Sequence, residues 1–517
     1  MPGITIPQVC YTFSQWQNRP ALSSEACRSS EGLLYAQQYR QNQEEETKMK
    51  ARQHIKGLAA SATAGTADEA REPIFQDWAR FVSFQPRLYF RPQDLDELKR
   101  FLTGLQQEPF KPRNLRVLGG LHSCSDICVS DAIVDVSDLS RTIEFDADHT
   151  LVTVSANWHL HDFLLALSAH GKSLSATGGT DEQTLAGLIS TNTAPATPRY
   201  GLYDLLEWVE YLTIVAASQS DVEQHVSKTD PAFPAVIGSL GAIGILTKVQ
   251  FRLIDELYFE TIQKIVKLSE VLTDVAQTSQ TYDFWRIDWI PDTDEGLLWA
   301  ATRIPQADPS GDYPADQAEN ILKYVFNLLD KLESAGPLLD TAMRLIYRGI
   351  ARTYGETKVS GPLRTMLPVD RRAPLHVAMA EWSFNPADLN NLMDRCIEYY
   401  EQKGWPNLPI EIELTKTDPY FMSPWNWPGL EYIVKFNFMY LTDISGTTSE
   451  REDILAHLRG LWDHLRRANI PFKAHWGKIN FMDDQFVNDH FQFDQFKPFI
   501  CSMFLNKYLT DRFNPTS

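Results

Sequence analysis

The sequence predicts an α+β protein of two domains, the first interrupted by glycine-rich loops and the second built on a mostly antiparallel sheet. The chain has 517 residues, which is enough for two domains of ordinary size. Short apolar strands alternate with amphipathic helical segments along most of its length. Glycine-rich stretches occur at 119–125, 175–193 and 238–244. We therefore expect a ligand-binding domain followed by a second α+β domain.

Composition indicates a globular chain and narrows the choice of partners. Hydrophobic residues make up 43% and charged residues 22%, as in proteins with an ample core. The net charge of −19 disfavours nucleic acid, an anionic membrane or a strongly anionic substrate. No apolar run approaches the roughly 20 residues that span a bilayer. Residues 1–20 lack the basic and apolar regions of a secretory signal, so we expect an intracellular protein without a membrane span.

Residues 1–72 form a predicted N-terminal extension. Residues 31–58 are charged and prone to form a helix, and 60–67 are small residues typical of a loose connection. Two interpretations fit this pattern: a helical extension that packs on the body of the protein, or a module that binds a partner.

The elements of the first domain follow from hydrophobic periodicity. An apolar strand at Arg116–Leu118 leads into paired glycines, and Ala132–Val136 and Leu151–Ala156 are further predicted strands. His159–Gly171 has helical apolar spacing and stops at a glycine. The segment 175–193 then offers many hydroxyl and amide donors with little bulk, as a buried phosphate group requires.

The second half of the chain alternates strands with amphipathic helices, which predicts a mostly antiparallel sheet with helices packed against it. Residues 305–370 contain several prolines, glycines and aspartates and indicate an insertion or cap. The predicted strands are Tyr258–Ile262, Phe284–Ile290, Val377–Phe384, Ile410–Leu414 and Leu430–Leu441, and the predicted helices are Ser269–Thr278, Asp388–Lys403 and Arg451–Asn469.

The loop after the Arg116 strand carries the clearest chemical signal. Gly119 and Gly120 allow close approach of the backbone to a ligand and leave amide groups free to bind anionic oxygens. His122 follows at the tip of the loop, where a role in packing is not expected. The alternative is an ordinary strand-to-loop turn with an incidental histidine, since short glycine patterns are common.

Motifs at both ends of the chain resemble one known family. The segments Trp78–Arg80, Phe84–Pro92 and Gly119–Asp126 resemble the FAD-binding domain of the vanillyl-alcohol oxidase / p-cresol methylhydroxylase (PCMH) superfamily. The sequences His475-Trp-Gly-Lys and 503–513 resemble its C-terminal motifs. The most similar branch is the sugar-1,4-lactone oxidases, such as gulonolactone and arabinonolactone oxidases. Matches at both ends in the correct order are more specific than any one of them.

The resemblance implies a PCMH-type FAD-binding domain with two subdomains and an α+β substrate domain. We therefore expect four parts in the chain: the extension at 1–72, the FAD domain at 73–256, the substrate domain at 257–500, and a segment at 501–517 that returns to the FAD domain. The resemblance also implies that FAD is attached covalently through His122. A second attachment through cysteine is not expected, because 177–218 contains none.

The resemblance places the cofactor in the glycine-rich loops and beside them. The expected FAD-binding residues are Gly119, Gly120, Leu121, His122, Ser123, Cys124, Ser125, Asp126, Ser137, Gly178, Gly179, Thr180, Thr184, Gly187, Ser190, Thr191, Thr193, Gly244, Ile245 and Lys478.

Lys478 is also a candidate catalytic residue. A reduced flavin is anionic at one edge, so a cation or an amide donor is needed there, and the family motif puts Lys478 in the active site. The alternative is a solvated lysine at the end of a strand. His475, three residues earlier, would point to the opposite face of a strand and support the flavin or fill the core.

Glu411 and Glu413 are the other candidate catalytic residues, and they mark the main departure from the family. Strand geometry places both on one face, but Glu413 stands where lactone oxidases carry an arginine. Two buried carboxylates would raise one pKa and create an acid/base. Alternatively, Glu413 pairs with Lys435, or both glutamates face water.

Other features leave the chemistry open. Ala194 replaces a family histidine, and Leu121 replaces a third glycine. Ser137 stands beside the expected flavin, where the resemblance implies glycine in oxidases and alanine in dehydrogenases, so a serine leaves the electron acceptor undecided. Aromatic residues clustered near 405–432 would favour a flat or apolar substrate. Cys124 and Cys128 alone are poor evidence for zinc, so no metal is expected.

The sequence therefore predicts an FAD-dependent oxidoreductase that oxidises an alcohol or a lactone, with O2 or another acceptor reoxidising the flavin and hydrogen peroxide as the product from O2. One alternative is a specialised oxidase for a larger, more apolar biosynthetic intermediate. Another is a flavin-binding protein without turnover. The partner is a small-molecule substrate, and the oligomeric state is not predicted.

Overall fold

The computed structural model describes residues 73–104, 114–215, 220–306, 348–349, 355–366, 376–442 and 448–514. These residues belong to one unit, Glu72–Ser517, and Met1–Arg71 form another. The predicted extension at 1–72 and most of the predicted insertion at 305–370 lie outside the described residues.

A three-stranded parallel sheet begins the unit and places the loop of His122. Its strands are β3 (Leu88–Phe90), β5 (Ala132–Asp135) and β4 (Leu115–Leu118), in that order. Leu115, Ala132 and Val134 are fully buried, as expected for a parallel sheet covered on both faces. The amphipathic helix α2 (Leu95–Gly104) packs into the same core through Leu98 and Leu102.

A five-stranded antiparallel sheet follows, in the order β10-β9-β11-β7-β6. Alternate valines such as Val152 and Val154 are buried, which is why the segment forms a strand with one face in the core. Helices α3 (Leu160–Ser168) and α4 (Leu185–Thr191) are inserted between β7 and β9. The strands are β6 (Ile143–Phe145), β7 (Leu151–Ser155), β9 (Leu206–Val215), β10 (Ser220–Ser227) and β11 (Ile245–Arg252).

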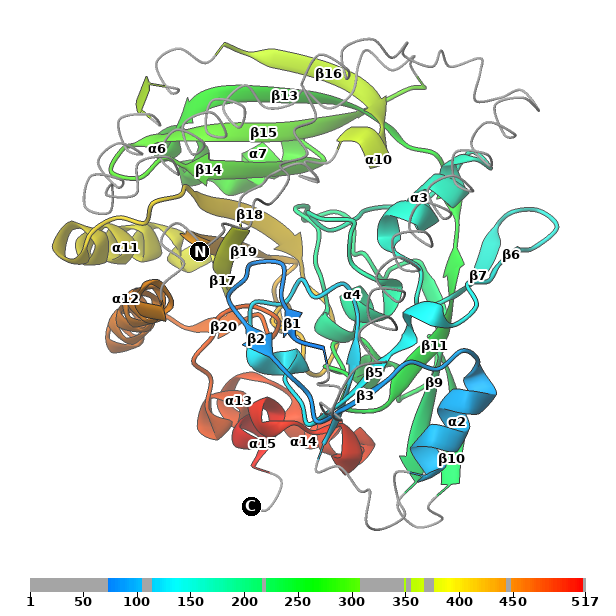
Figure 1. Cartoon of the computed structure of the whole chain (residues 1–517). Helices are drawn as coiled ribbons and strands as arrows, with labels where there is room; N and C mark the ends of the chain where they lie inside the picture. Colours follow the sequence, from blue (N-terminus) through cyan, green and yellow to red (C-terminus); the bar gives the residue numbers. More distant parts are fainter. Residues whose placement is uncertain are drawn as a thin grey trace, which may run out of the picture. The chain divides into compact units, whose positions relative to one another are not determined.

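An eight-stranded antiparallel sheet dominates the C-terminal half (Figure 1). Its order is β16-β13-β15-β14-β18-β19-β17-β20, so β14 and β18 are neighbours although more than a hundred residues separate them. The strands are β13 (Tyr258–Lys267), β14 (Phe284–Trp289), β15 (Glu295–Ile304), β16 (Thr357–Pro362), β17 (His376–Phe384), β18 (Ile410–Lys416), β19 (Tyr432–Thr442) and β20 (Phe472–Ala474). Helices α11 (Leu389–Lys403) and α12 (Thr448–Arg467) lie side by side next to β17–β19 (Figure 1).

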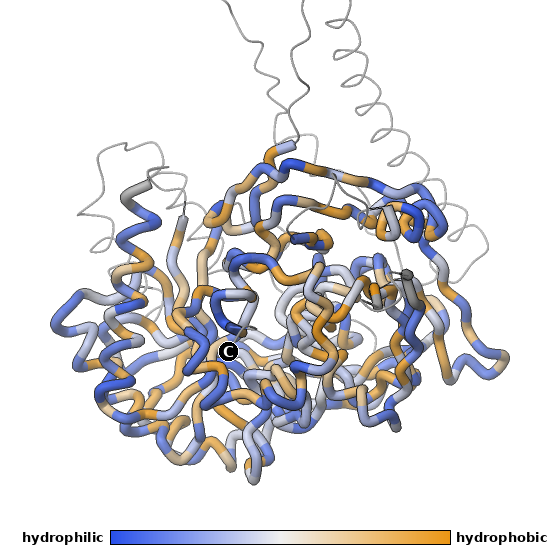
Figure 2. Tube along the Cα trace, turned by 90° about the horizontal axis from the view of Figure 1, so that it is seen from below, coloured by the Kyte–Doolittle hydropathy of each residue, from blue (hydrophilic) through white to orange (hydrophobic). Residues whose placement is uncertain are grey.

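The remaining elements are short. They are the strands β1 (Phe75–Gln76), β2 (Ser83–Phe84), β8 (Lys172–Ser173) and β12 (Ile254–Asp255), and the helices α5 (Phe233–Val236), α6 (Leu268–Val271), α7 (Val275–Thr281), α10 (Leu363–Met366), α13 (Asp484–His490), α14 (Phe493–Phe496) and α15 (Lys507–Phe513). Figure 2 shows hydrophobic and hydrophilic residues alternating along the strands, the period-2 pattern of a sheet with one face in the core.

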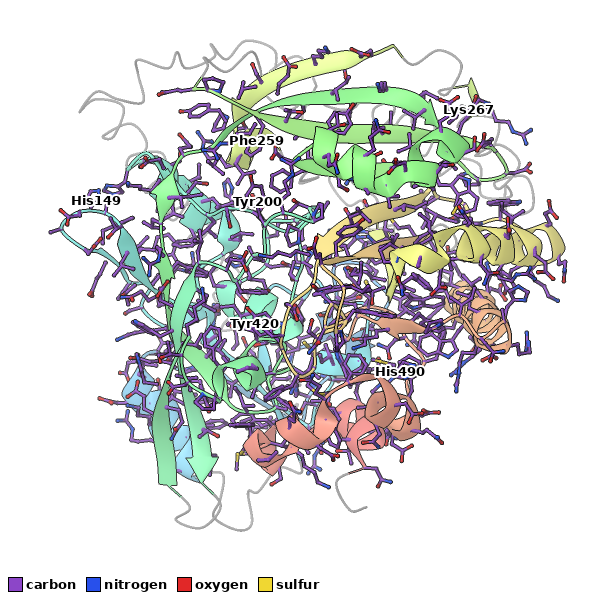
Figure 3. The ribbon with its side chains drawn as sticks, turned by 180° about the vertical axis from the view of Figure 1, so that it is seen from behind. His149, Tyr200, Phe259, Lys267, Tyr420 and His490 are labelled. Atoms are coloured by element: carbon purple, nitrogen blue, oxygen red, sulfur yellow. The ribbon has the colours of Figure 1, made fainter. Side chains whose placement is uncertain are left out.

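Two sets of contacts join the N-terminal part of the unit to its C-terminal half. Near the start of β13, Phe259 and Phe284 pack edge to face with ring centroids 5.4 Å apart, and Tyr200 from the preceding part of the chain packs beside them (Figure 3). At the other end, the backbone amide of Cys501 donates to Ala242, and the Asn506 side chain donates to three carbonyls in 126–129. The last described residues therefore pack against the first part of the unit.

The predicted fold class is confirmed. Every pairing in the eight-stranded sheet is antiparallel, and the predicted strands and helices of both halves are present with small shifts at their ends. One element was wrong: the strand expected through His475 and Lys478 ends at Ala474. His475–Lys478 is a turn in which the Lys478 amide donates to the His475 carbonyl.

Candidate functional site

A cleft runs along the C-terminal end of β4, and its empty space, part of which is open to solvent, is about 850 Å³. Most of its lining comes from β4 and the following loop up to residue 123, from residues 183–191 at and around α4, and from the segment 240–246 that leads into β11. Strand β4 delivers the loop and β11 delivers the third segment, so the parallel and antiparallel sheets meet at this cleft.

Glycines are required here because there is no room for a side chain. A Cβ on Gly119 would lie 2.9 Å from Thr184 Oγ1, and one on Gly120 would lie 2.8 Å from the Glu182 carbonyl oxygen. Gly244 has φ +154° and a Cβ there would lie 2.2 Å from a backbone oxygen. Leu121 has φ +54°, a left-handed conformation that is strained for a residue with a side chain.

The loop also offers hydrogen-bond donors. Among the described residues, none accepts a hydrogen bond from the backbone amides of Gly120–Ser123. Successive free amides in a glycine loop form a concave anion site, as the phosphates of a dinucleotide require. The residues present therefore fit an FAD diphosphate.

His122 lies at the edge of the cleft and is partly buried. Its Nε2 is 3.2 Å from a carboxylate oxygen of Glu182, and its ring stacks on Trp78 at 5.9 Å. Burial, together with the positive charge of Lys478, lowers the pKa of His122 to about 4. The imidazole is therefore neutral at physiological pH and keeps a lone pair available for bond formation.

The cleft is lined by eleven of the residues expected to bind the cofactor. They are Gly119, Gly120, Leu121, His122, Ser123, Thr184, Gly187, Ser190, Thr191, Gly244 and Ile245.

The other expected cofactor residues lie outside that lining. Cys124 and Ser125 bond to the backbone of the turn at 475–478, through the Cys124 amide and the Ser125 hydroxyl. Ser137 is exposed and accepts a hydrogen bond from Arg91. The rest are Asp126, Gly178, Gly179, Thr180, Thr193 and Lys478.

The turn at His475–Lys478 closes on the glycine loop from the C-terminal half. The Cys124 amide donates to the Gly477 carbonyl at 2.8 Å, and a Cβ on Gly477 would lie 2.9 Å from Ser123 Oγ. Trp476 is fully buried and anchors the turn. Because it is a turn, Lys478 is not held opposite His475, and its charge acts on both His122 and Glu381.

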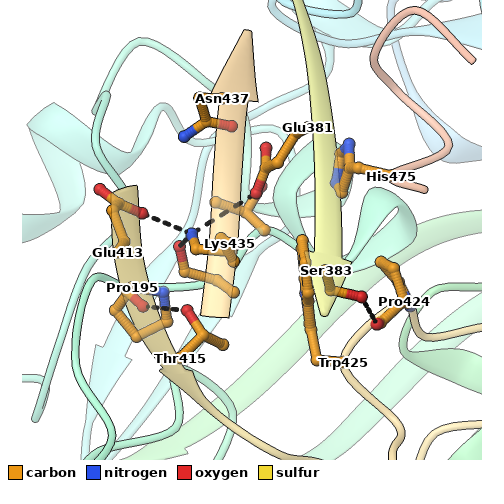
Figure 4. Close-up of polar contacts among 12 residues, drawn as sticks. Pro195, Glu381, Ser383, Glu413, Thr415, Pro424, Trp425, Lys435, Asn437 and His475 are labelled. Carbon is orange, nitrogen blue, oxygen red and sulfur yellow. Dashed lines mark hydrogen bonds and ion pairs between the residues drawn. The ribbon is translucent and has the colours of Figure 1, made fainter. Parts of the chain in front are cut away.

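A buried ion cluster lies on β17, β18 and β19 (Figure 4). Lys435 Nζ is 2.7 Å from Glu413 and 3.4 Å from Glu381, and it donates to the Ala194 carbonyl at 3.3 Å. The Lys435 side chain is only 3% exposed. Of the alternatives for Glu413, the pairing with Lys435 is the one observed, and the exposed-face interpretation is wrong because Glu413 is buried.

Charges within this cluster perturb one another. Burial raises the pKa of Glu413 to about 7 against the opposing attraction of Lys435. Burial also acts to raise the pKa of Glu381, but Lys435 and neighbouring cations hold it below its usual value. The pKa of Lys435 lies above its usual range, since its two carboxylate partners outweigh its burial. The cluster therefore contains a permanent cation and one carboxyl group that titrates near neutral pH.

Glu411 has a different partner. Its carboxylate is 3.1 Å from Arg286 Nη1 on β14 and accepts a hydrogen bond from the Asn437 side chain. Glu411 and Arg286 are 15% and 19% exposed, so the pair remains accessible. The arginine missing at 413 is thus replaced in space by Arg286, which the sequence analysis did not identify. Strand order alone brings it there.

The aromatic residues expected to shape a pocket are mostly core. Trp425 is 1% exposed, stacks on His475 at 5.7 Å and donates to the Asn192 carbonyl. Tyr420 is also buried in the main core. Burial lowers the pKa of His475 to about 4 despite the nearby Glu381, so His475 acts as a neutral part of this packing.

The described part of the chain contains neither a group of metal ligands nor a membrane-spanning helix. No group of three histidine, cysteine or acidic residues there could hold a metal ion. Among the helices described, none is long and apolar enough to cross a membrane.

Two protein families match the chain in the order of its two halves. The FAD binding domain family matches residues 86–219, and the D-arabinono-1,4-lactone oxidase family matches residues 249–503. The cleft at the glycine loop falls largely in the first match, and the ion cluster falls in the second.

Two kinds of lactone oxidase are similar in sequence to this chain over part of their length. The D-arabinono-1,4-lactone oxidase of Kluyveromyces lactis is 28% identical over 238 residues, 45% of this chain and 44% of that protein. The L-gulonolactone oxidase of Bos taurus is 28% identical over 218 residues, 42% of this chain and 48% of that protein. The aligned part thus spans about half the length of these relatives.

Solved structures share the fold. The cholesterol oxidase of Brevibacterium sterolicum superposes with a TM-score of 0.68 at 14% identity, covering 87% of this chain and all of that one. A solvent-stable cholesterol oxidase gives a TM-score of 0.70 at 15% identity, covering 86% of this chain and 96% of that one. At such identities the likeness supports the fold alone.

Proposed function

We propose that this chain is an FAD-dependent oxidoreductase acting on an alcohol or a lactone, because its two halves match the FAD binding domain family and the D-arabinono-1,4-lactone oxidase family in that order. One observation carries the proposal: a neutral, partly buried His122 at the edge of a glycine-lined cleft, near enough to Lys478 for that charge to lower its pKa. FAD, when bound, would supply the hydride acceptor for this chemistry.

We infer that His122 holds the flavin covalently. Its low pKa leaves one ring nitrogen unprotonated, and the stacked Trp78 and the contact of Nε2 with the Glu182 carboxylate orient the ring. The free amides of Gly120–Ser123 would bind the diphosphate, and Lys478 would place a positive charge near the reacting edge.

We propose that the substrate binds beside Glu411 and Arg286. A carboxylate accepts hydrogen bonds from hydroxyl groups, and the guanidinium donates to carbonyl or hydroxyl oxygens. The pair is 3.1 Å apart and partly exposed, which suits a hydroxylated ligand such as an aldonolactone or an alditol. Glu413 is committed to Lys435, so it would tune the site without contacting substrate.

The covalent bond is tested by acid precipitation of the purified protein and of His122→Ala. Yellow colour should remain in the washed wild-type pellet and be absent from the variant pellet. His225→Ala, which removes an exposed histidine far along β10, is the matched control and should behave as wild type. Free FAD in the wild-type supernatant would contradict the covalent bond, and no flavin at all would contradict the proposed function.

Turnover is tested with a panel of lactones, alditols and larger apolar alcohols, measuring peroxide release and O2 uptake. We expect hydroxylated substrates to be oxidised and Glu411→Gln to lower kcat/KM by about a hundredfold, the range for a positioned acid/base group. Glu260→Gln, which changes an exposed glutamate on β13, is the control and should alter kcat/KM far less. Turnover of only apolar alcohols would favour the specialised oxidase, for which the absence of an arginine at 413 is the supporting observation.

A protein that binds flavin without turnover is the remaining alternative. The departures at Leu121, Ala194 and Glu413 support it. Bound flavin that bleaches with a substrate from the panel and recovers its colour in air would exclude it.

A further inference from the structure

Arg116 is a buried cation without a described anionic partner, at the floor of the cleft that we assign to FAD. It is 5% exposed on the central part of β4, three residues before Gly119, and it lines the cleft. Among the described residues, no carboxylate forms an ion pair with it. A buried guanidinium normally pairs with an anion, because the loss of hydration is otherwise uncompensated.

The neighbours of Arg116 hold the guanidinium but leave its charge unbalanced. Nη1 donates to the Phe504 carbonyl at 2.9 Å, and Nη2 donates to the Leu240 carbonyl. Nε is buried and has no hydrogen-bond acceptor. A guanidinium has five N–H groups, so these two bonds leave donor capacity unused.

The backbone at Gly241 passes close to the Arg116 guanidinium. Gly241 has φ +65°, and a Cβ there would lie 3.3 Å from Nη2, so the glycine lets the backbone pass close to the guanidinium. Gly241 also lines the cleft. Burial holds the pKa of Arg116 below its usual value, although it stays a cation because an arginine pKa begins so high.

We propose that Arg116 binds the diphosphate of FAD and supplies its countercharge. The inference rests on the proposed function and adds a residue to its cofactor site. The free amides of Gly120–Ser123 provide hydrogen bonds and no net charge, whereas a diphosphate carries two negative charges. Arg116 is the cation that the cleft offers from beneath the same loop, and the two carbonyls fix its position before the cofactor arrives.

The test uses His122→Ala as the parent protein, so that flavin binding is reversible. FAD and riboflavin are titrated against the parent and against its Arg116→Met, Arg116→Gln and Arg116→Lys derivatives by quenching of flavin fluorescence. Riboflavin lacks the diphosphate and is the matched ligand. Arg512→Met, which removes a guanidinium held by Tyr508 and Asn480 away from the cleft, is the matched protein control.

We expect Arg116→Met and Arg116→Gln to weaken FAD about ten- to a hundredfold, as for the loss of a charged hydrogen bond, and to leave riboflavin unchanged. Arg116→Lys should recover most of the FAD affinity. Equal weakening of both ligands would overturn the proposal and make Arg116 a structural clamp, and so would unchanged FAD binding. Arg116→Gln can still donate to one carbonyl, which keeps the test decisive if Arg116→Met does not fold. A parent that binds no FAD would instead contradict the proposed function.

Discussion

Leu121 occupies a conformation that a glycine would adopt without strain. Its φ of +54° is enforced by the loop, in which the Trp78 amide donates to the Leu121 carbonyl at 2.8 Å. Both Leu121→Gly and Leu121→Ala remove the side chain, but only alanine keeps a Cβ in the left-handed region. We expect Leu121→Gly to be more stable than Leu121→Ala by about 1 kcal/mol. Urea unfolding of the two variants measures the difference, and the opposite order would contradict the strain.

Glu413 should make the stability depend on pH near neutrality. Its folded-state pKa of about 7 lies above the ordinary value of 4.5, so the folded state binds the proton more tightly than the unfolded state. The free energy by which this proton stabilises the folded state is fully present below the unfolded pKa and is lost as the pH rises from 4.5 through 7. We expect a loss on the order of 1–3 kcal/mol across that window. Glu381, with a lowered pKa, has the opposite sign and acts below 4.5.

The measurement is the free energy of unfolding from pH 5 to pH 8, for the wild type and for Glu413→Gln. The variant should lose the part of the slope between pH 6 and pH 7, whereas Asp77 and Asp418, whose pKa values burial raises to about 6, still contribute a slope below pH 6. Glu413→Gln with an unchanged slope would show that another group titrates in the window.

At the level of elements, α4 depends on one cap. The Thr184 hydroxyl accepts a hydrogen bond from the Gly187 amide at 3.1 Å, and both residues line the cleft. Thr184→Ala should cost about 1 kcal/mol of stability, and Thr184→Ser much less, because only serine retains the oxygen. Thr191→Ala, at the other end of the helix, is the control, since its hydroxyl donates to a carbonyl and caps nothing. Thermal unfolding with and without FAD measures the effect, and equal losses at 184 and 191 would exclude the cap.

Elements also show what the sequence can and cannot predict. Apolar periodicity located β18 and β19 well, and strand alternation put Glu411 and Glu413 on one face. Periodicity says nothing of which strands are neighbours, so Arg286 on β14 could not be linked to Glu411. The turn at His475 was missed because Ala474 and Trp476 read as strand residues, whereas Gly477 and the contact with Cys124 determine the chain direction there.

At the scale of the whole molecule, Asn506 ties the C-terminal segment to the loop after His122. Its amide group donates to the carbonyls of Asp126, Ile127 and Val129 at 2.9–3.1 Å, and its oxygen caps α15. Asn506→Ala should cost about 2–4 kcal/mol, because it leaves several buried carbonyls unpaired. Asn488→Ala, which removes one exposed hydrogen bond, should cost little. Guanidinium unfolding measures both, and a loss below 1 kcal/mol for Asn506→Ala would show that water replaces the amide.

The contact between the turn at 475–478 and the loop at 119–126 has a consequence for how the protein matures. Ribosomes deliver the glycine loop hundreds of residues before the turn that closes on it. Until residues 476–504 have been synthesised, the Cys124 amide and the Ser125 hydroxyl lack their acceptors at Gly477 and Trp476, and Arg116 lacks the Phe504 carbonyl. In a nascent chain that ends before residue 504, the loop at 119–126 therefore lacks the contacts that hold it, and we expect the cofactor to bind only after these residues have been made.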